Sequence, residues 1–330
     1  MRNAVAVVLA LVVAAPARAG DVEMDPDARK ATAKALKWLA ANQNADGSWG
    51  TGLYPHNTAV TAFALLAFMS QGHHPGQGLY GPEVAEGTRF LLASEQADGY
   101  LVGTFGGNMY AHAMATLALA ELWGMAGGEP IRATLERATA LIVKSQSPEG
   151  GWRYEPAPTG HDISSTIMQV MALRAAKNSG LHVPDQTIRR AIEYVRLCYD
   201  APSGGFRYMP GQREPAYART AAGICILQLT GKYEAQEIAR AVEFMAGLGE
   251  ETARFWYGQY YAAHALHQVG GKTWRDWYAR TRGRLLERQA PDGHWGSWKG
   301  SDDAVGPAYR TAIAVTVLSV PLNYLPIFQR

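Results

Sequence analysis

The 330-residue sequence predicts an all-α fold in which six helical hairpins stand side by side in a double-layered ring. Three observations lead to this prediction. A short glycine-containing turn recurs roughly every 50 residues, an amphipathic helical pattern precedes each copy, and a far more apolar helical pattern follows it. Such an array is a solenoid or a closed ring rather than an alternating α/β protein.

The turns share a polar residue, an acidic or small residue before a glycine, and then an aromatic or apolar residue. Asp-Gly and Glu-Gly supply the positive φ with which a chain leaves a helix. A degenerate sixth copy is expected near residues 247–258, because the last interval is about twice as long as the others. The five plain copies are QNADGSW (43–49), EQADGYL (95–101), QSPEGGW (146–152), DAPSGGF (200–206) and QAPDGHW (289–295).

The aromatic residues of the turns are interpreted as packing groups, with substrate contact as the alternative. A flat ring that follows the glycine lies against the neighbouring hairpin. The turn residues to which we assign this structural role are Gln43, Trp49, Gln146, Trp152, Phe206, Gln289 and Trp295.

Each turn lies between two helices of different character. The preceding helices place apolar residues at spacings of three and four, with charged residues between them, as in 31–43, 131–146 and 188–199. The following helices have no charged face for water, so they form the buried inner layer. These inner helices are expected at 58–68, 111–122, 165–176, 219–229, 260–269 and 310–320.

The end of the chain favours a closed ring over an open superhelix. An open array ends in polar capping repeats, whereas the last segment, SVPLNYLPIF (319–328), is apolar.

The first 19 residues predict a signal peptide, and residues 20–330 a single domain. Arg2 is followed by an apolar run and by Ala17 and Ala19 at a small-residue cleavage site. The alternative, a membrane anchor, needs roughly 20 apolar residues, and the run is shorter than that. We therefore expect an exported protein, periplasmic or secreted, with no transmembrane helix after cleavage.

The charge balance and the two cysteines limit which partners and which covalent or metal links the sequence predicts. Cleavage removes Arg2 and Arg18, so the 31 basic residues fall to 29 and equal the 29 acidic ones. Without a basic excess, nucleic acid is not an expected partner. Cys198 and Cys225 make no metal-binding pattern, and both a disulfide and two buried thiols remain open.

The Gln-to-Trp turns resemble the QW repeats of the squalene cyclase and prenyltransferase β-subunit superfamily, over nearly the whole mature chain. The resemblance implies a closed α/α toroid, or (α/α)6 barrel, with an apolar central cavity. In related enzymes this cavity holds isoprenoids, and the chemistry takes place where the inner helices begin. The same fold serves several unrelated reactions, so the residues at that end decide the activity.

The segment from Asp162 to Thr166 resembles the Asp-x-Asp-Asp-Thr motif of hopene-type and class II diterpene cyclases, whose middle aspartic acid protonates a double bond or an epoxide. Ser164 and Ser165 stand where that acid and its neighbour are expected. A serine hydroxyl is far too weak an acid for this step. The usual proton donor is therefore missing.

The other chemistries of the superfamily lack their residues too. Prenyltransferase β-subunits hold zinc with an Asp-x-Cys pair and a histidine, but Asp162-x-Ser164 has no thiolate. The sequence contains neither the Gly-Cys-Gly-Glu-Gln run of thioester domains nor the cysteine pair of lanthionine-type cyclases. We expect no metal and no cofactor, and a three-histidine site from His56, His112 and His264 is disfavoured because the residues lie in different repeats.

Aligning the inner helices gives two columns of side chains near the cavity mouth. For the threonines, capping of backbone groups is the alternative to ligand contact. The first column is Thr58, His112, Thr166, Thr220, Gln259 and Thr311, and the second, two residues earlier, is His56, Tyr110, Ser164, Ala218, Tyr257 and Tyr309. The candidate rim residues are Tyr110, His112, Ser164, Thr166, Tyr257, Gln259, Tyr309 and Thr311.

Three aspartates are candidate acids. Asp162 precedes an inner helix, where an N-cap is the alternative role. Asp302 and Asp303 are adjacent, and repulsion between two carboxylates raises one pKa. Arg219 and Arg310 precede column threonines and are expected to pair with these acids or to bind an anionic group. The aromatic run 255–261 stabilises a carbocation in one interpretation and packs the core in the other.

Two functions follow from these observations. The first is an exported toroid that holds an apolar, isoprenoid-like ligand or a partner segment in its cavity, without the usual acid or zinc site. The alternative is an isoprenoid or triterpene cyclase, or a prenyltransferase-type enzyme, that uses a nonstandard aspartic acid.

Overall fold

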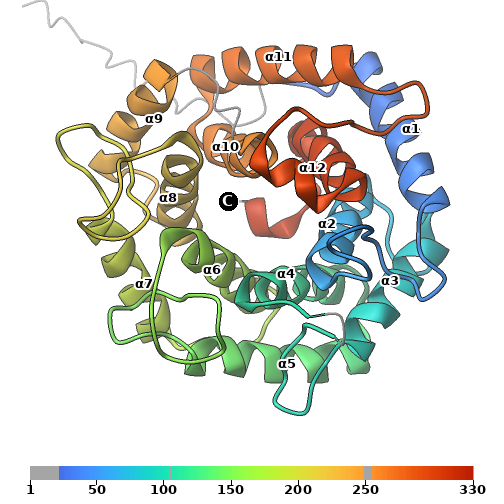
Figure 1. Cartoon of the computed structure of the whole chain (residues 1–330), viewed down its shortest axis with the longest axis horizontal. Coiled ribbons are helices and arrows are strands. Elements are labelled where there is room, and N and C mark those ends of the chain that lie inside the picture. The colour runs from blue at the N-terminus through green and yellow to red at the C-terminus, as the bar shows by residue number, and fades with distance from the viewer. Residues whose placement is uncertain (1–21, 104–105, 249–253, 330) are drawn as a thin grey trace, which may run out of the picture.

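The computed structural model describes residues 22–103, 106–248 and 254–329, which include twelve α-helices. Viewed along its axis, the chain forms a ring of two concentric helical layers (Figure 1). The outer helices are α1 (Pro26–Ala41), α3 (Gly81–Ala93), α5 (Glu129–Lys144), α7 (Asp185–Leu197), α9 (Gln236–Leu248) and α11 (Gly271–Arg288). The inner helices are α2 (Thr58–Met69), α4 (Met109–Ala126), α6 (Ile163–Asn178), α8 (Tyr217–Leu229), α10 (Phe255–Val269) and α12 (Pro307–Ser319).

The ring closes through both layers. In the inner layer α12 packs against α2, and in the outer layer α1 packs against α11. The last turn also docks on the first helix, because Gln289 Nε2 donates a hydrogen bond of 2.8 Å to the carbonyl oxygen of Ala31. The predicted closed α/α toroid of six helical hairpins is therefore confirmed.

Burial separates the two layers as the sequence pattern predicts. In the inner helix α2, every residue except Ala59 is buried. In the outer helix α7, the buried residues Thr187, Ala191, Tyr194 and Val195 repeat at helical spacing and form one face. The inner helices lie between the outer layer and the centre of the ring, which explains why they carry no charged stripe.

The turn of the third hairpin shows how each repeat is tied to the next. Trp152 donates from indole Nε1 to the carbonyl oxygen of Ile142 at 2.8 Å, and its backbone N–H donates to Thr166 Oγ1 at 3.1 Å. Gln146 Nε2 donates to the carbonyl oxygen of Thr187, on the next outer helix, at 2.9 Å. Corresponding hydrogen bonds are made in the other repeats by Gln43, Trp49, Phe206, Gln289 and Trp295.

The fifth hairpin is joined differently, because α9 ends at Leu248 and α10 begins at Phe255. The segment 247–258, which we expected to hold the degenerate turn, begins in α9 and ends in α10. Its residues 249–253 lie outside the described residues. The helical pair itself is present, so the ring keeps its six hairpins.

The predicted signal peptide, residues 1–19, also lies outside the described residues. Within the described ranges, no helix combines the length and the apolar character needed to cross a membrane. Cys198 and Cys225 are both buried as free thiols, so the structure contains no disulfide between them. Burial raises the pKa of Cys198 to about 12, which keeps this thiol protonated and unreactive.

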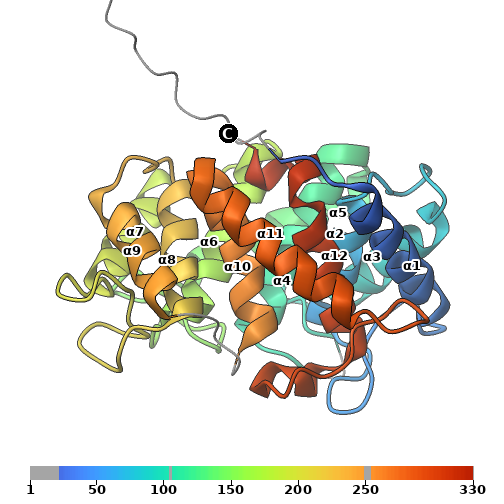
Figure 2. The same ribbon diagram turned by 90° about the horizontal axis from the view of Figure 1, so that it is seen from above.

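The C-terminal segment folds back over one end of the ring. After α12 the chain forms two 3-10 helices, η2 (Val320–Leu322), which packs against α10, and η3 (Pro326–Phe328), which packs against α4 and α6. The C-terminus lies at the centre of the ring in Figure 1 and at one end of it in Figure 2. We call this the far end, and we call the end where the inner helices begin the mouth.

Candidate ligand-binding site at the mouth of the ring

A pocket of about 460 Å³ opens at the mouth. Its walls come from α2, α4, α10 and α12, from the loops before them, and from the 3-10 helix η1 (Ser301–Val305). The volume lies within the usual range for small-molecule sites. We call it the mouth pocket and define it by Asp302 and by six aromatic residues: Tyr54, Phe63, Tyr110, Tyr154, Tyr257 and Tyr309.

Asparagine caps fix the starts of two helices that form this pocket. Asn57 Oδ1 accepts the backbone N–H groups of Ala59 and Val60, and Asn108 Oδ1 accepts that of Tyr110 at 2.9 Å. A cap sets the first turn of a helix and therefore which side chains face the ring axis. Ala59 and Phe63, one turn apart on α2, both line the pocket.

The structure brings together three of the predicted rim residues, Tyr110, Tyr257 and Tyr309, from three different inner helices. The rings of Tyr110 and Tyr257 are 6.4 Å apart, and Tyr309 meets Phe63 edge to face at 5.2 Å. Burial raises the pKa of each of these three phenols above its ordinary value. The walls of the mouth pocket are therefore neutral and mainly aromatic.

Aromatic side chains also fill the centre of the ring below the mouth pocket. Phe63 meets Tyr260 edge to face at 5.3 Å, and Tyr260 meets His264 at 5.0 Å. His264 then stacks on Phe328, from the C-terminal segment, at 3.3 Å. The family resemblance implies a central cavity, and along the axis of this ring the described residues leave a pocket of ligand size at the mouth.

Asp302 is the one of the three candidate acids that lines the mouth pocket. Its Oδ2 accepts the backbone N–H of Tyr257 at 2.9 Å, at the first turn of α10. Its Oδ1 is buried and accepts no hydrogen bond from any described residue. Partial burial raises the pKa of Asp302, and the neighbouring Asp303 carboxylate adds to this effect. The group is thus a weaker acid than usual, held among aromatic rings.

Asp303 points away from the pocket and organises the loop behind it. Its Oδ2 accepts hydrogen bonds from the Ser297 hydroxyl at 2.7 Å and from two backbone N–H groups, and its Oδ1 accepts the indole N–H of Trp256 at 3.0 Å. Partial burial raises the pKa of Asp303, but these hydrogen bonds lower it by more, so the net pKa is below the ordinary value. Arg310 pairs with its carbonyl oxygen at 2.6 Å.

Asp162 is fully buried as the N-cap of α6, where Oδ1 accepts the Ser165 N–H at 2.8 Å. Burial raises its pKa, but it does not line the mouth pocket. Ser164, at the position where the resemblance places the proton donor, is buried and does not line the mouth pocket either. The structure therefore places neither Asp162 nor Ser164 in the lining that contains Asp302.

We expected His112 at the rim, and the structure places it inside the wall instead. Its Nδ1 accepts the backbone N–H of Leu101 at 3.0 Å, so the ring is neutral and its Nε2 donates to the carbonyl oxygen of Ala138 at 3.2 Å. Burial lowers its pKa to about 4. His112 therefore holds the second turn in place.

Thr166, Thr311 and Gln259 also lie away from the rim where we expected them. The hydroxyls of Thr166 and Thr311 accept the backbone N–H of a turn tryptophan, and in the first repeat Thr61, rather than the expected Thr58, has this role. Gln259 faces a separate cavity between α9 and α11. Successive helical residues point about 100° apart, so residues two apart face nearly opposite sides and only the earlier column reaches the pocket.

Sequence reasoning missed three of the aromatic pocket residues. Phe63 is found by its spacing of four from Ala59 on one helical face. Tyr54 and Tyr154 lie in loops after the turns, and loop residues have no period that shows their direction. Tyr154 is anchored by a 2.8 Å hydrogen bond between its hydroxyl and that of Tyr208.

The three histidines considered for a metal site lie in separate surroundings. His56 pairs with Asp46 at 2.7 Å, His112 lies in the wall, and His264 lies under the C-terminal segment. Among the described residues, no group of three or more His, Cys, Asp or Glu side chains is arranged to hold a metal ion.

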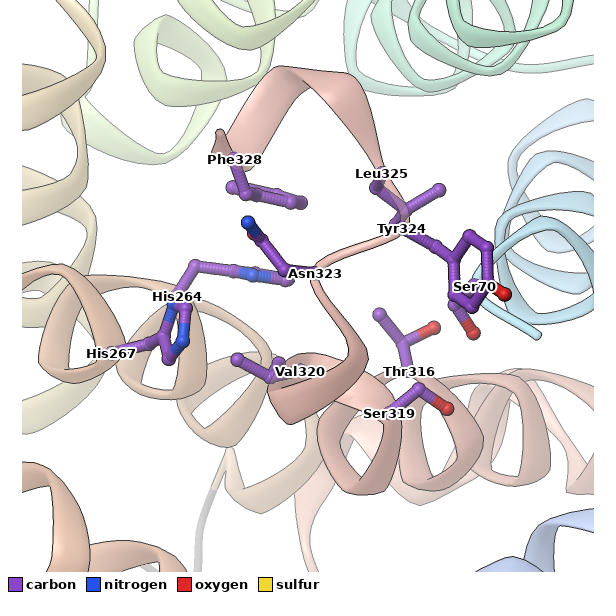
Figure 3. A pocket seen from close by; sticks show the side chains of 10 residues that line it. All are labelled: Ser70, His264, His267, Thr316, Ser319, Val320, Asn323, Tyr324, Leu325 and Phe328. Carbon is purple, nitrogen blue, oxygen red and sulfur yellow. The ribbon is translucent and has the colours of Figure 1, made fainter. Parts of the chain in front are cut away.

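At the far end, the C-terminal segment lies against the inner helices, and its side chains face His264 and His267 of α10 (Figure 3). Phe328 lies over His264, Gln268 donates to the Phe328 carbonyl oxygen, and the buried Glu121 accepts the Ile327 N–H at 3.2 Å. Burial raises the pKa of Glu121 to about 8. Only about 20 Å³ remains between this segment and the helices, against about 460 Å³ at the mouth.

Two enzymes are similar in sequence to part of this chain. The chain is 28% identical over 190 residues to a drimenyl diphosphate synthase from Streptomyces showdoensis, a match that covers 57% of this chain and 34% of that protein. It is 28% identical over 136 residues to the lanosterol synthase of Mus musculus, covering 39% of this chain and 19% of that protein. The matched region thus spans about a third or less of each of these relatives.

Solved structures share the ring itself. The type II terpene cyclase MstE from Scytonema superposes with a TM-score of 0.64 at 15% identity, covering 92% of this chain and 100% of that one. An α-1,6-mannanase of Salegentibacter, solved in complex with α-1,6-mannotriose, superposes with a TM-score of 0.67 at 8% identity, covering 90% and 99%. At such identities these two likenesses establish the fold and not the reaction.

The match to a protein-family model agrees with the repeated turns, with the closed ring and with the sequence relatives. The model of the prenyltransferase alpha-alpha toroid domain matches residues 13–162 and 159–261, which together are more than half of the chain. The resemblance drawn from the QW-type turns is confirmed. This chain belongs to the prenyltransferase alpha-alpha toroid family.

Proposed function

We propose that this protein binds one apolar, isoprenoid-like molecule in the mouth pocket. The observation that carries the proposal is a pocket of about 460 Å³ walled by six aromatic side chains, in a ring whose far end is closed. Aromatic walls contribute hydrophobic stabilisation over the whole length of a hydrocarbon chain. Because the centre of the ring is packed, the ligand enters and leaves through the mouth.

The relatives support an isoprenoid ligand over other apolar molecules. Curated relatives are named as drimenyl diphosphate and lanosterol synthases, and MstE was solved in complex with geranylgeranyl dihydroxybenzoate. The mannanase shares the ring, but it matches at only 8% identity. We further propose that the protein is exported, on the basis of the signal peptide predicted at residues 1–19.

We propose binding without acid-initiated cyclisation because the position where the family carries its catalytic acid holds a serine in this chain. Ser164 stands there, and Tyr257 is among the hydroxyl-bearing residues that line the pocket. Neither group transfers a proton to an alkene, because an alkene is a very weak base and requires a strong acid. In this role the tyrosines only shape the pocket and exclude water from it.

The test is the capture of a ligand by the purified protein. Native mass spectrometry and lipid extraction are expected to show one bound isoprenoid, or saturable one-to-one uptake of farnesol or geranylgeraniol by the empty protein. Ala59→Trp fills the mouth pocket and is expected to abolish uptake, whereas Ala279→Trp, on the exposed face of α11, leaves it unchanged. Uptake that both variants retain would show that the ligand binds elsewhere.

A second function, acid-initiated cyclisation, is favoured by one observation: the unpartnered Oδ1 of Asp302 in the mouth pocket. A protonated Asp302 would transfer its proton to an alkene carbon, and the new carbocation would lie beside Phe63 and Tyr309. The carboxylate that remains keeps its hydrogen bond from the Tyr257 N–H. The cation is discharged when a neighbouring carbon loses a proton to water.

This second function has its own test. Incubation with squalene or with a geranylgeranyl substrate would yield a cyclic product, which Asp302→Asn abolishes without loss of binding. Asp162→Asn is the matched control, because the amide oxygen still accepts the Ser165 N–H. Binding without any product from the wild-type protein would leave the first function alone standing.

A further inference from the structure

A cavity of about 320 Å³ lies in the wall of the ring, on the opposite side of α10 from the mouth pocket. Residues of α8, α9, α10 and α11 line it, so it opens between the outer helices α9 and α11. We call it the wall cavity and define it by six residues: Met245, Ala246, Gln259, Leu266, Trp277 and Arg280. It takes no part in the function proposed above.

In the other repeats, a turn of the chain occupies the corresponding place. The third repeat has been described above: the carbonyl of Ile142 accepts the indole N–H, and Thr166 accepts the backbone N–H of the same tryptophan. Gly150 of that turn packs so closely on the carbonyl of Arg190 that any side chain would collide with it. These three contacts hold a glycine-x-aromatic turn between two outer helices and one inner helix.

Outer helices offer these contacts at a fixed spacing. On α1, Ala31 accepts the side chain of Gln289, Lys34 faces Gly293, and Leu39 accepts the indole of Trp49. We number these contact positions on each outer helix. The first, like Ala31, accepts the turn glutamine; the second, like Lys34, lies three residues later and faces the turn glycine; the third, like Leu39, lies five residues after the second and accepts the indole of the following turn.

The same series continues on α11 and α9. On α11 the third position is Leu285, whose carbonyl accepts the indole of Trp295. The first and second positions of α11 are then Trp277 and Arg280, and both line the wall cavity. On α9 the second position is Arg240, which faces Gly204, and the third is Met245, which also lines the cavity. The outer-helix positions that would hold a fifth turn thus surround a space that no described residue fills.

Gln259 supplies the remaining contact. It occupies the position of Thr166, Thr220 and Thr311, whose hydroxyls accept the N–H of the turn's aromatic residue. The Gln259 side chain is only 4% exposed, and its Oε1 accepts no hydrogen bond from any described residue. A buried acceptor without a donor is unfavourable. The site therefore has each contact for a turn that the described residues do not provide there.

The connection between α9 and α10 is too short to provide it. Only residues 249–254 separate the two helices, whereas residues 145–162 separate α5 from α6 and include the turn. A chain segment needs enough residues to leave the outer helix, form the turn and return to the inner helix.

We infer that the wall cavity is a docking site for a glycine-x-aromatic turn of another polypeptide. Such a turn has the groups that the site lacks: a ring for the cavity, an N–H for Gln259 and a glycine that permits close approach to α11. Four of the five occupied places in this ring hold a glycine-x-aromatic turn, and the second holds Gly-Tyr-Leu. A second chain with an exposed loop of this kind would bind where no described residue of this protein forms such a turn.

The test uses a fluorescently labelled peptide with the sequence of residues 289–297, QAPDGHWGS, and the full-length protein. Fluorescence anisotropy is expected to show weak but saturable one-to-one binding, because a short flexible peptide loses conformational freedom on docking. The same peptide with tryptophan replaced by alanine is expected not to bind. No saturable binding of the parent peptide would overturn the inference.

A double-mutant cycle locates the contact. Gln259→Leu in the protein and N-methylation of the tryptophan amide in the peptide are each expected to weaken binding roughly fivefold, as for the loss of one hydrogen bond. Combined, they are expected to cause no further loss, because they remove the same bond. Independent, additive losses would contradict the assignment of Gln259.

Two further variants guard against misfolding and against a different ligand. Ala246→Trp, at an exposed position that borders the cavity, is expected to abolish binding, and Gln236→Leu, exposed on the same helix, is expected to leave it unchanged. Binding that survives Ala246→Trp would place the peptide elsewhere. If tryptophanamide bound as tightly as the peptide, the site would take a small aromatic molecule, and the polypeptide assignment would fail.

Discussion

The two ends of the ring are built from the same inner helices and yet have opposite properties. At the mouth, long loops leave a pocket of about 460 Å³ lined by a partly buried carboxyl group, Asp302, whose Oδ1 accepts no hydrogen bond from any described residue. At the far end, the C-terminal segment leaves about 20 Å³, and the buried Glu121 accepts a hydrogen bond from Ile327. A toroid therefore becomes a one-entrance site through segments added to the repeats, and not through the repeats themselves.

Removal of the Phe328 ring is expected to cause the largest loss of stability, because this ring packs at the closed far end. Phe328→Ala deletes a buried side chain stacked on His264, so we expect a loss of about 3–5 kcal/mol in the free energy of unfolding. Chemical denaturation measures it. Tyr324→Ala, which removes a ring that is 52% exposed in the same segment, serves as the control and is expected to change stability by much less. Equal effects of the two variants would show that the far end is not closed by burial.

Glu121 makes the closed end sensitive to pH. Its pKa is about 8 in the folded protein, against an ordinary value of 4.5. Between these values the folded state keeps a proton that the unfolded state has lost, so stability falls as pH rises. Each unit of difference in pKa corresponds to about 1.4 kcal/mol, which gives an effect of a few kcal/mol.

Glu121→Gln is expected to remove this decline, so that the variant unfolds at a higher temperature than wild type at pH 8 and at a similar one at pH 4. Thermal unfolding at the two pH values measures the difference. A decline of the same size in both proteins would assign it to other groups.

A substitution of Thr166 tests whether this residue supports the wall of the ring or binds the ligand at the mouth. Thr166→Val removes the acceptor of the Trp152 N–H, and the buried donor left without a partner is expected to lower stability by about 1–3 kcal/mol. Isoprenoid uptake at a temperature well below unfolding is expected to stay unchanged. A stable variant that loses uptake would return Thr166 to the pocket rim.

The smallest expected change in stability is that of Asp302→Asn. This variant tests a buried carboxyl group at the mouth, as Glu121→Gln does at the far end. Burial raises the pKa of Asp302, so its ionisation lowers stability as pH rises through the folded value. The amide keeps an acceptor for the Tyr257 N–H, and the group is partly exposed, so we expect less than about 1 kcal/mol of change at pH 7. A loss of several kcal/mol would mean that the charged carboxylate is needed to cap α10.

The fold was accessible from the sequence because its information is local and repeated. Each plain turn carries a glycine that leaves the helix and an aromatic or apolar residue that enters the wall, so five copies were enough to predict an array of helical hairpins. The same repetition aligned Tyr110, Tyr257 and Tyr309, which the structure brings together.

The rest depends on side-chain directions that have no sequence period. Asp302 and Asp303 are adjacent, yet one faces the pocket and the other accepts hydrogen bonds within its loop. The column with Thr166 faces the wall because it is rotated away from the column with Ser164. The apolar character of residues 319–328 argued for closure, but only tertiary contacts show that Phe328 reaches His264.

The central claim is that the mouth pocket is where an isoprenoid binds. Photo-crosslinking with a diazirine-bearing farnesyl or geranylgeranyl alcohol, followed by peptide mapping, tests it most directly. Labels are expected on Phe63, Tyr110, Tyr257 and Tyr309, and excess unlabelled geranylgeraniol is expected to suppress them. Saturable labels confined to the far end or to the wall cavity, with none on these four residues, would contradict it.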